Sequence, residues 1–223
     1  MMHRSPDAAQ ACGRHILDLL GQKPRSTLAI SGGSSPKPMF EMFAHAAFVW
    51  SRVDLFWVDE RGVPPGDPQS NFKLANDLWL KPAGFPPSGI HRIQAELDAQ
   101  EAARRYTDEI RAVFRLLPGD MPEFDVIHLG MGPDAHTASL FPGEPKIDDR
   151  TGIAAGLWVE KMKQWRITLL PGVLLAARHI AMLESGADKA DALKAVLEGP
   201  YDPKKHPAQL ILSARDVEWF IAA

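Results

Sequence analysis

Cysteine is nearly absent from this chain of 223 residues, and long apolar runs are missing. Cys12 is the only cysteine, which excludes an internal disulfide and a structural zinc site built on several thiolates. The longest apolar stretches, at residues 55–58 and 169–177, are much shorter than the ~20 residues that span a bilayer. The first residues, MMHRSPDAAQ, also lack the apolar core of a signal peptide. We therefore expect a cytoplasmic protein that does not bind membranes.

An excess of charge of one sign is missing as well. Lys and Arg number 25 and Asp and Glu number 28, so the formal net charge is −3. This balance gives no reason to expect nucleic acid or an anionic membrane surface as a partner. The hydrophobic fraction of 45% is typical of a globular chain, and a chain of this length buries enough surface to hold a core without cross-links. We expect one domain over residues 1–223, monomeric or weakly homo-oligomeric.

Strand-like and helix-like segments alternate along the chain. Short β-prone runs predict strands at residues 27–30, 54–58, 124–129, 152–159, 166–169, 179–183 and 210–212. Capping signals and apolar periodicity predict helices at residues 6–20, 36–47, 98–116, 171–177 and 189–198, with another starting near Asn71 after a loop rich in Pro and Gly at residues 59–71. Strands interleaved with helices favour an α/β fold with a mainly parallel sheet. Ligands of such sheets bind beyond the carboxyl ends of the strands, so chemistry is expected in the loops that follow strands.

The first such loop comprises residues 31–35, with the sequence SGGSS, and leads into a helix. Gly32 and Gly33 let the backbone turn tightly, and the hydroxyls of Ser34 and Ser35 lie where the helix begins. A helix N-terminus presents free N–H groups and a partial positive charge, which suits a phosphate. The other interpretation is a plain N-capped turn. The loop lacks the Gly-Lys-Ser/Thr ending of a Walker A loop and the Gly-x-Ser-x-Gly pattern of a nucleophile elbow.

The second loop begins with Asp59, Glu60 and Arg61, directly after the predicted strand at residues 54–58. Two acids and a base at the end of a strand are expected to face a cleft rather than the core. The alternative is a solvated loop with local ion pairs, which contribute little to stability.

The third loop, residues 130–137, has the sequence GMGPDAHT. It satisfies the Gly-x-Gly-x-x-Gly/Ala dinucleotide pattern, but Pro133 removes a backbone donor that would bind a pyrophosphate, so we reject that interpretation. His136, two residues from Asp134, is a candidate general base, because histidine exchanges protons near neutral pH. The alternative is a histidine that merely caps a short helix. His128, within the strand before this loop, is expected to be a core residue.

Two basic residues complete the candidate set. Arg166 opens a predicted strand, and Lys189 lies at another strand-to-helix junction; either would serve equally well as a surface charge. No His-Glu-x-x-His or comparable ligand spacing occurs, so we expect neither a catalytic metal nor a cofactor.

Taken together, these segments resemble the 6-phosphogluconolactonase family. SGGSSP is similar to the family's Ser-Gly-Gly-Ser-Thr-Pro loop, and WVDERGVPPGDPQSNF to its Asp-Glu-Arg segment with a downstream Ser-Asn-Tyr. LGMGPDAHTASLFP is similar to its Gly-Met-Gly-x-Asp-Gly-His-Thr-Ala-Ser-Leu-Phe-Pro segment, and RITLL and ESGADKADAL to its C-terminal Arg and Lys segments. The blocks occur in family order and cover most of the chain.

The resemblance implies a Rossmann-like, mainly parallel sheet flanked by helices on both faces, as in glucosamine-6-phosphate deaminase. It implies hydrolysis of 6-phospho-D-glucono-1,5-lactone, the second step of the oxidative pentose phosphate pathway, with a sugar-phosphate lactone as the partner. Catalysis is assigned to His136 as base, with Asp134 or Asp59 assisting, and binding to Gly32, Gly33, Ser34, Ser35, Arg166 and Lys189 for the phosphate and Arg61 for the phosphate or a sugar hydroxyl.

The chain departs from the family pattern at three positions. Ser35 replaces a threonine and keeps its hydroxyl, whereas Phe72 replaces a tyrosine and loses it. Ala135 replaces a glycine, and if this position needs a positive φ, alanine strains it by about 1 kcal/mol. Such strain would affect catalytic efficiency through the placement of His136.

Two other functions fit parts of the sequence. One is a glucosamine-6-phosphate deaminase or isomerase, but Arg61 stands where deaminases have Tyr, and residues 139–142, SLFP, differ from their Phe-Asn-Glu-Pro. The other is a non-catalytic module that binds sugar phosphates, in which His136 would have little use.

Overall fold

Seven parallel strands form the main sheet of the computed structural model, which describes residues 1–222. Their spatial order is β1-β10-β9-β6-β2-β3-β5. The strands are β1 (Met2–Arg4), β2 (Ser26–Ile30), β3 (Val53–Trp57), β5 (Ile90–His91), β6 (Val126–Leu129), β9 (His179–Glu184) and β10 (Val217–Ile221). The inner strands are buried almost throughout, as expected of parallel strands covered on both faces.

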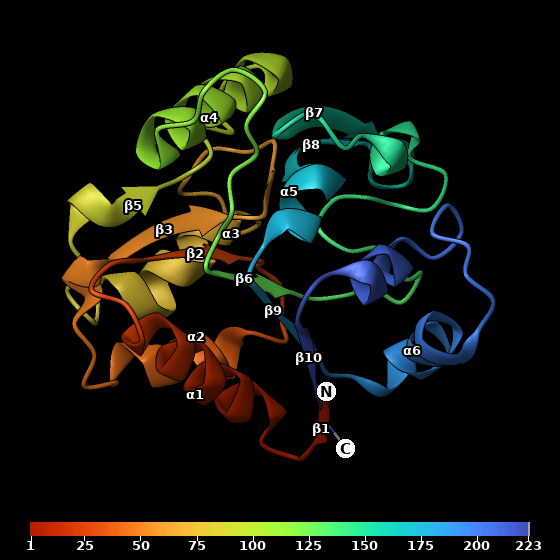
Figure 1. The fold of residues 1–223 in the computed structure, drawn as a ribbon, viewed down its shortest axis with the longest axis horizontal. Coiled ribbons are helices and arrows are strands. Elements are labelled where there is room, and N and C mark those ends of the chain that lie inside the picture. The colour runs from red at the N-terminus through yellow and green to blue at the C-terminus, as the bar shows by residue number, and fades with distance from the viewer. Residues whose placement is uncertain (223) are drawn as a thin grey trace.

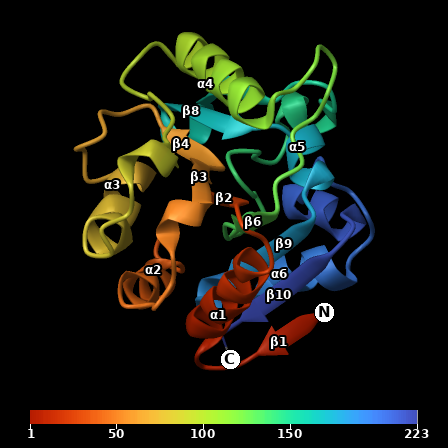
Figure 2. The ribbon, with the colours of Figure 1, turned by 60° about the vertical axis from the view of Figure 1, so that its left-hand side comes forward.

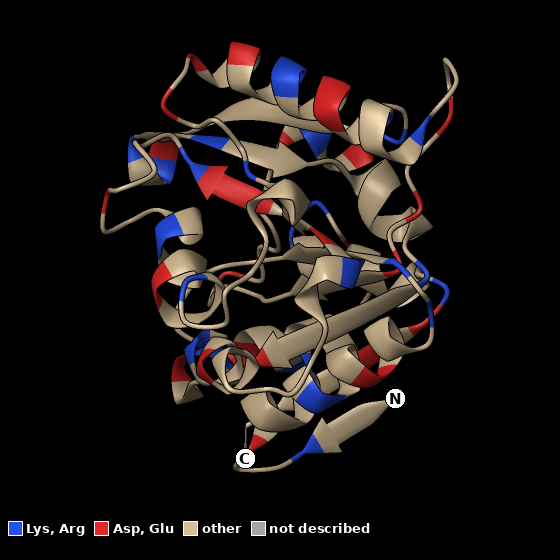
Figure 3. Cartoon of the chain, turned by 90° about the vertical axis from the view of Figure 1, so that its left-hand side faces the viewer, with Lys and Arg blue, Asp and Glu red and all other residues tan. Residues whose placement is uncertain are grey.

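Helices cover both faces of this sheet (Figure 1). They are α1 (Ala8–Gly21), α2 (Lys37–Ala44), α3 (Asn71–Ala75), α4 (Ala99–Phe114), α5 (Pro171–Ala176) and α6 (Ala190–Glu198). Helices α1 and α2 pack against each other on one side, whereas α4 and α5 lie on the other. Acidic and basic residues alternate along the outer face of α4, at the top of Figure 3, where Arg104 pairs with Glu101 and Asp108.

A second, antiparallel sheet lies between α4 and the main sheet (Figure 2). It has the order β4-β8-β7, with β4 at Asp59–Arg61, β8 at Gln164–Leu169 and β7 at Ala154–Val159. Tyr106 of α4 reaches the main sheet, where its hydroxyl accepts a hydrogen bond from the Trp57 amide and donates one to the Trp57 carbonyl. These hydrogen bonds tie α4 to the last residue of β3, next to the point where β3 leads into β4.

The order of the strands indicates where a ligand would bind. The chain proceeds from β2 to β3 and β5 on one side, and then returns to β6 on the other side of β2. The loops after β2 and β6 therefore diverge at the carboxyl edge of the sheet, which is where parallel α/β sheets bind ligands. These two loops are residues 31–35 and 130–137, both singled out by the sequence.

Several predicted elements differ from the structure. Residues 210–212, expected to be a strand, belong to the 3₁₀-helix Pro207–Ser213, and the last strand is β10. Pro207 favours a helical start, and the buried Gln209 side chain donates hydrogen bonds to the carbonyls of Ala195 and Pro200. Residues 59–61, expected within a loop, form β4, because they pair with β8. The strands β1, β5 and β10 and the antiparallel sheet were not predicted.

Among residues 1–222, the helices are all too short or too polar to cross a bilayer.

Candidate active site

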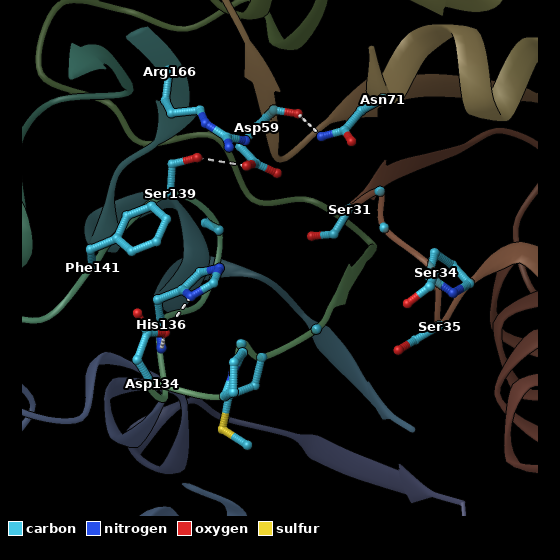
Figure 4. A pocket seen from close by; sticks show the side chains of 18 of the residues that line it. Ser31, Ser34, Ser35, Asp59, Asn71, Asp134, His136, Ser139, Phe141 and Arg166 are labelled. Carbon is cyan, nitrogen blue, oxygen red and sulfur yellow. Dashed lines mark hydrogen bonds and ion pairs between the residues drawn. The ribbon is translucent and has the colours of Figure 1, made fainter. Parts of the chain in front are cut away.

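A cavity of about 370 Å³ opens at the crevice between the loops after β2 and β6. All ten predicted site residues line it, and they come from five separate parts of the chain. The residues are Gly32, Gly33, Ser34, Ser35, Asp59, Arg61, Asp134, His136, Arg166 and Lys189. In Figure 4, Ser34 and Ser35 lie on one side of the cavity, and His136, Asp59 and Arg166 lie on the other.

The loop after β2 owes its path to glycine. Gly33 has a φ of +106°, in the region that favours glycine. Gly32 lies so close to the Asn71 side chain that a Cβ atom at this position would overlap the amide oxygen. The loop thus approaches the start of α3 closely, and presents Ser34 and Ser35 to the cavity at the start of α2.

Lys189 lies beside this loop. Its Nζ is 3.4 Å from the Ser35 Oγ, which also accepts a hydrogen bond of 2.8 Å from the Ser185 hydroxyl. The same ammonium forms an ion pair of 3.2 Å with Glu184, a carboxylate at the end of β9 that is only 2% exposed. Burial raises the pKa of Glu184 to about 7, although Lys189 opposes this shift.

The Asp-Glu-Arg segment divides its side chains between two faces, because successive residues of a strand point to opposite sides. Asp59 and Arg61 line the cavity, and the buried Glu60 points away from it. The Glu60 carboxylate accepts hydrogen bonds from the Ser70 hydroxyl and from the backbone amides of Arg61, Asn71 and Phe72. Burial raises the pKa of Glu60, and these four hydrogen bonds oppose the shift. Glu60 therefore holds the start of α3 in place.

Asp59 is held from two sides. The Ser139 hydroxyl donates a hydrogen bond of 2.6 Å to its carboxylate, and the Asn71 side-chain amide donates one of 2.9 Å to its carbonyl (Figure 4). The Asn71 amide oxygen is buried beside Gly32 without a hydrogen-bond partner. Sequence reasoning identified Asn71 only as part of a helix start and did not single out Ser139.

Two guanidinium groups stand side by side at this end of the cavity. Arg61 of β4 and Arg166 of β8 are paired in register, and the Nε atom of each is buried without a partner. Within residues 1–222, neither forms an ion pair with a carboxylate. Burial lowers the pKa of Arg166, nearby Asp59 raises it, and Arg61 lowers it. An arginine remains charged despite such shifts, so this end of the cavity offers positive charge to a ligand.

His136 and Asp134 form the hydrogen-bonded pair that the sequence predicted. Their Nδ1 and Oδ1 atoms are 2.6 Å apart, and the ring stacks on Phe141 at 4.2 Å between centroids. Burial would raise the pKa of Asp134, but hydrogen bonds from His136 and Lys161 outweigh it and hold the pKa well below its ordinary value. In the neutral imidazole, the ionised carboxylate favours the tautomer with the proton on Nδ1, in which Nε2 is an acceptor that faces the cavity.

Lys161 is a contact that sequence reasoning missed. It lies in the turn between β7 and β8, and its Nζ is 2.8 Å from the second carboxylate oxygen of Asp134. The turn also brings Met162 to the mouth of the cavity. No local pattern signals this contact, because Lys161 and Asp134 are 27 residues apart and meet only through the folded hairpin.

Gly132 leaves room for the His136 ring. A Cβ atom at Gly132 would overlap this imidazole, and the Gly132 amide donates a hydrogen bond of 2.9 Å to the His136 carbonyl.

His128 is only 1% exposed, and burial lowers its pKa to about 3. It is thus neutral, as expected of a core histidine, although its strand brings it to the floor of the cavity.

Replacing Ala135 by glycine is expected to stabilise the protein. Ala135 has a φ of +63°, the left-handed conformation that the sequence comparison raised as a possibility. Relief of this strain should raise the free energy of unfolding by about 1 kcal/mol in a denaturant titration. Ala112→Gly, on the exposed side of α4, is the matched control and should lower it by about 1 kcal/mol. A loss of stability in Ala135→Gly would mean that the strain is smaller than the contribution of the Ala135 methyl group, which is buried in the core.

Within residues 1–222, no three His, Cys, Asp or Glu side chains gather where they would hold a metal ion.

Comparisons with known proteins give a consistent result. A family model described as glucosamine-6-phosphate isomerases/6-phosphogluconolactonase matches residues 3–219. A 6-phosphogluconolactonase of Synechocystis is 35% identical over 209 residues, which cover 92% of this chain and 85% of the relative. The crystal structure of 6-phosphogluconolactonase from Thermotoga maritima superposes with a TM-score of 0.87 at 26% identity, covering 100% of this chain and 99% of that one.

A monomeric glucosamine-6-phosphate deaminase shares the fold. It superposes with a TM-score of 0.83 at 21% identity, covering 100% of this chain and 96% of that one. The parallel sheet flanked by helices on both faces, predicted from the sequence, is therefore confirmed.

Proposed function

Because the chain belongs to the glucosamine-6-phosphate isomerase/6-phosphogluconolactonase family, we propose that it hydrolyses 6-phospho-D-glucono-1,5-lactone to 6-phosphogluconate. This substrate has a phosphate dianion at one end and a reactive ester at the other. Its hydrolysis needs an anion site and a base that activates water, set apart by the length of a sugar.

The arrangement of His136 supports this proposal most strongly. The imidazole has its Nδ1 bound to Asp134 and its Nε2 directed to a cavity whose other side carries Ser34 and Ser35. We assign the phosphate to the loop at residues 32–35 together with Lys189, which contacts Ser35. Binding energy at the phosphate then orients the carbonyl that reacts.

In the proposed mechanism, His136 acts first as a base and then as an acid. Nε2 takes a proton from water as its oxygen attacks the C1 carbonyl carbon. The tetrahedral intermediate collapses by breaking the bond between C1 and the ring oxygen, and His136 returns the proton to that oxygen. No covalent intermediate is needed, because a δ-lactone already hydrolyses readily in water. General-base catalysis of about 10²–10⁴-fold, or about 3–5 kcal/mol, suffices.

The family resemblance assigned Arg166 to the phosphate and Arg61 to the phosphate or a sugar hydroxyl, whereas we assign both arginines to the reacting end of the substrate. In Figure 4, Arg166 lies with Asp59 and Ser139, apart from Ser34 and Ser35. A buried guanidinium without a carboxylate partner is suited to bind a sugar oxygen and to stabilise the negative charge that develops on the carbonyl oxygen. Asp59, held by Ser139, would orient these groups or accept a hydrogen bond from the sugar.

The test is an assay with lactone generated in situ by glucose-6-phosphate dehydrogenase. The protein should remove the lactone faster than its spontaneous hydrolysis, and a chelator should leave the rate unchanged, because no step in this mechanism uses a metal. Glucosamine 6-phosphate serves as the control substrate, from which no ammonia should be released. A lactone decay that remains at the spontaneous rate would overturn the proposed function, and binding of 6-phosphogluconate without turnover would identify a binding module.

Replacing Lys189 by alanine is expected to weaken substrate binding. A hydrogen bond to a charged group contributes about 1.5–3 kcal/mol, so KM should rise by about 10–100-fold with kcat nearly unchanged. Lys194→Ala, at an exposed position of α6, is the matched control and should leave KM unchanged. A decrease in kcat alone would argue against Lys189 as the phosphate anchor.

A further inference from the structure

We propose that Glu184 controls the affinity of this cavity for phosphate, because it must release Lys189 and take up a proton when a phosphate dianion binds. The inference rests on the proposed function in one respect, the placement of the substrate phosphate at Lys189 and Ser35. Glu184 does not reach the reacting atoms, so it is a positioning residue that acts through Lys189.

The geometry places one ammonium between two acceptors. Lys189 Nζ is 3.2 Å from Glu184 Oε2 and 3.4 Å from Ser35 Oγ, and Ser35 faces the cavity. Both members of the ion pair are shielded from water, since the side chains of Lys189 and Glu184 are 16% and 2% exposed. A phosphate bound to Ser35 and Lys189 would therefore compete with the Glu184 carboxylate for the same ammonium.

Glu184 has few other partners. Its Oε1 atom is buried without a hydrogen bond, and the Met131 amide lowers its pKa. Lys189 and Arg4 of β1 are the other charged side chains that line, with Glu184, a second cavity of about 400 Å³, whose apolar lining includes Ile221 of β10 and Leu193 of α6. Asp188, in the following turn, packs against Gly186.

A second negative charge near this carboxylate is unfavourable, because the Glu184 side chain is only 2% exposed and water screens it little. Glu184 already has a pKa of about 7 in the free protein, so protonation costs little near neutral pH. When the dianion binds, a proton from solvent moves onto the Glu184 carboxylate. The Lys189 ammonium then leaves Glu184 and forms an ion pair with the phosphate. By linkage, the affinity for the dianion falls as the pH rises above 7.

The experiment measures binding of 6-phosphogluconate to the whole protein by calorimetry at pH 6 and pH 8. Glu184→Gln keeps the size of the side chain and imitates its protonated form. It should bind about tenfold more tightly than wild type at pH 8 and equally at pH 6, as a pKa of about 7 requires. Glu198→Gln, an equal change of charge at an exposed position of α6, should match wild type at both pH values.

A second readout uses wild-type protein alone. Titrations at pH 8 in two buffers with different ionisation enthalpies should show uptake of nearly one proton per ligand, and Glu184→Gln should show almost none. Absence of proton uptake in wild type, or an equal affinity ratio at both pH values, would overturn the inference. Because both readouts measure binding, a protein that shows this linkage without hydrolysing the lactone would contradict the proposed function and leave this inference intact.

Discussion

Replacing His136 by alanine is expected to lower kcat for lactone hydrolysis by about 10²–10⁴-fold, the usual contribution of a general base. KM should change little, because the phosphate is assigned to the other side of the cavity. The reason lies in the pair with Asp134, which holds the imidazole with Nε2 available to accept a proton from water. The measurement is the enzymatic rate above spontaneous hydrolysis, since the spontaneous reaction limits the loss that can be observed.

Two controls separate proton transfer from a structural effect. His45→Ala removes an exposed histidine after α2 and should retain wild-type activity. Imidazole added to the His136→Ala variant should restore part of the rate, because it fits the space beside Phe141 and supplies the same base. A His136→Ala variant with the wild-type rate would show that His136 is not the general base.

Replacing Gly132 by alanine is expected to reduce kcat by at least about 10²-fold, although no group that touches the substrate is removed. A Cβ atom at this position would overlap the His136 ring, so the imidazole must move away from the position that the cavity requires. A displacement of about 1 Å at a catalytic group has effects of this size. The kcat of Gly132→Ala should be measured beside that of the His136→Ala variant.

Gly130→Ala is the matched control in the same loop. Its new Cβ would meet only the Leu183 carbonyl, at an ordinary distance of 3.6 Å, so we expect a loss of less than tenfold. If the two variants lost activity equally, the loop would be sensitive to any added methyl group, and the specific role of Gly132 in seating His136 would be wrong.

The fold was predictable where local patterns decide structure. The strands β2, β3, β6 and β9 are apolar runs bounded by turns. The Asp98 carboxylate caps α4 by accepting hydrogen bonds from two backbone amides, as the capping signal at this position predicted. The predictions were wrong where the pairing of strands decides the secondary structure. The segment 210–212 is as apolar as a strand but finds no partner, whereas the polar β4 becomes a strand because β8 lies beside it.

The candidate site divides in the same way. The residue types of His136, Asp134 and Lys189, each in a loop after a strand, are visible in the sequence and converge on the cavity. The roles of Glu60 and Glu184 are not visible, because each depends on burial and on distant groups: the start of α3 for Glu60, and Ser35 through Lys189 for Glu184. The sequence identifies a carboxylate, but it does not show whether folding buries that carboxylate away from water.

A crystal structure with 6-phosphogluconate bound would test directly which end of the cavity binds C1 and which binds the phosphate. We predict that the C1 carboxylate lies near His136 Nε2, in direct contact or through one water molecule, with the phosphate at Ser35 and Lys189. A complex with the phosphate at Arg61 and Arg166, or with C1 beyond the reach of a single water from residue 136, would contradict it.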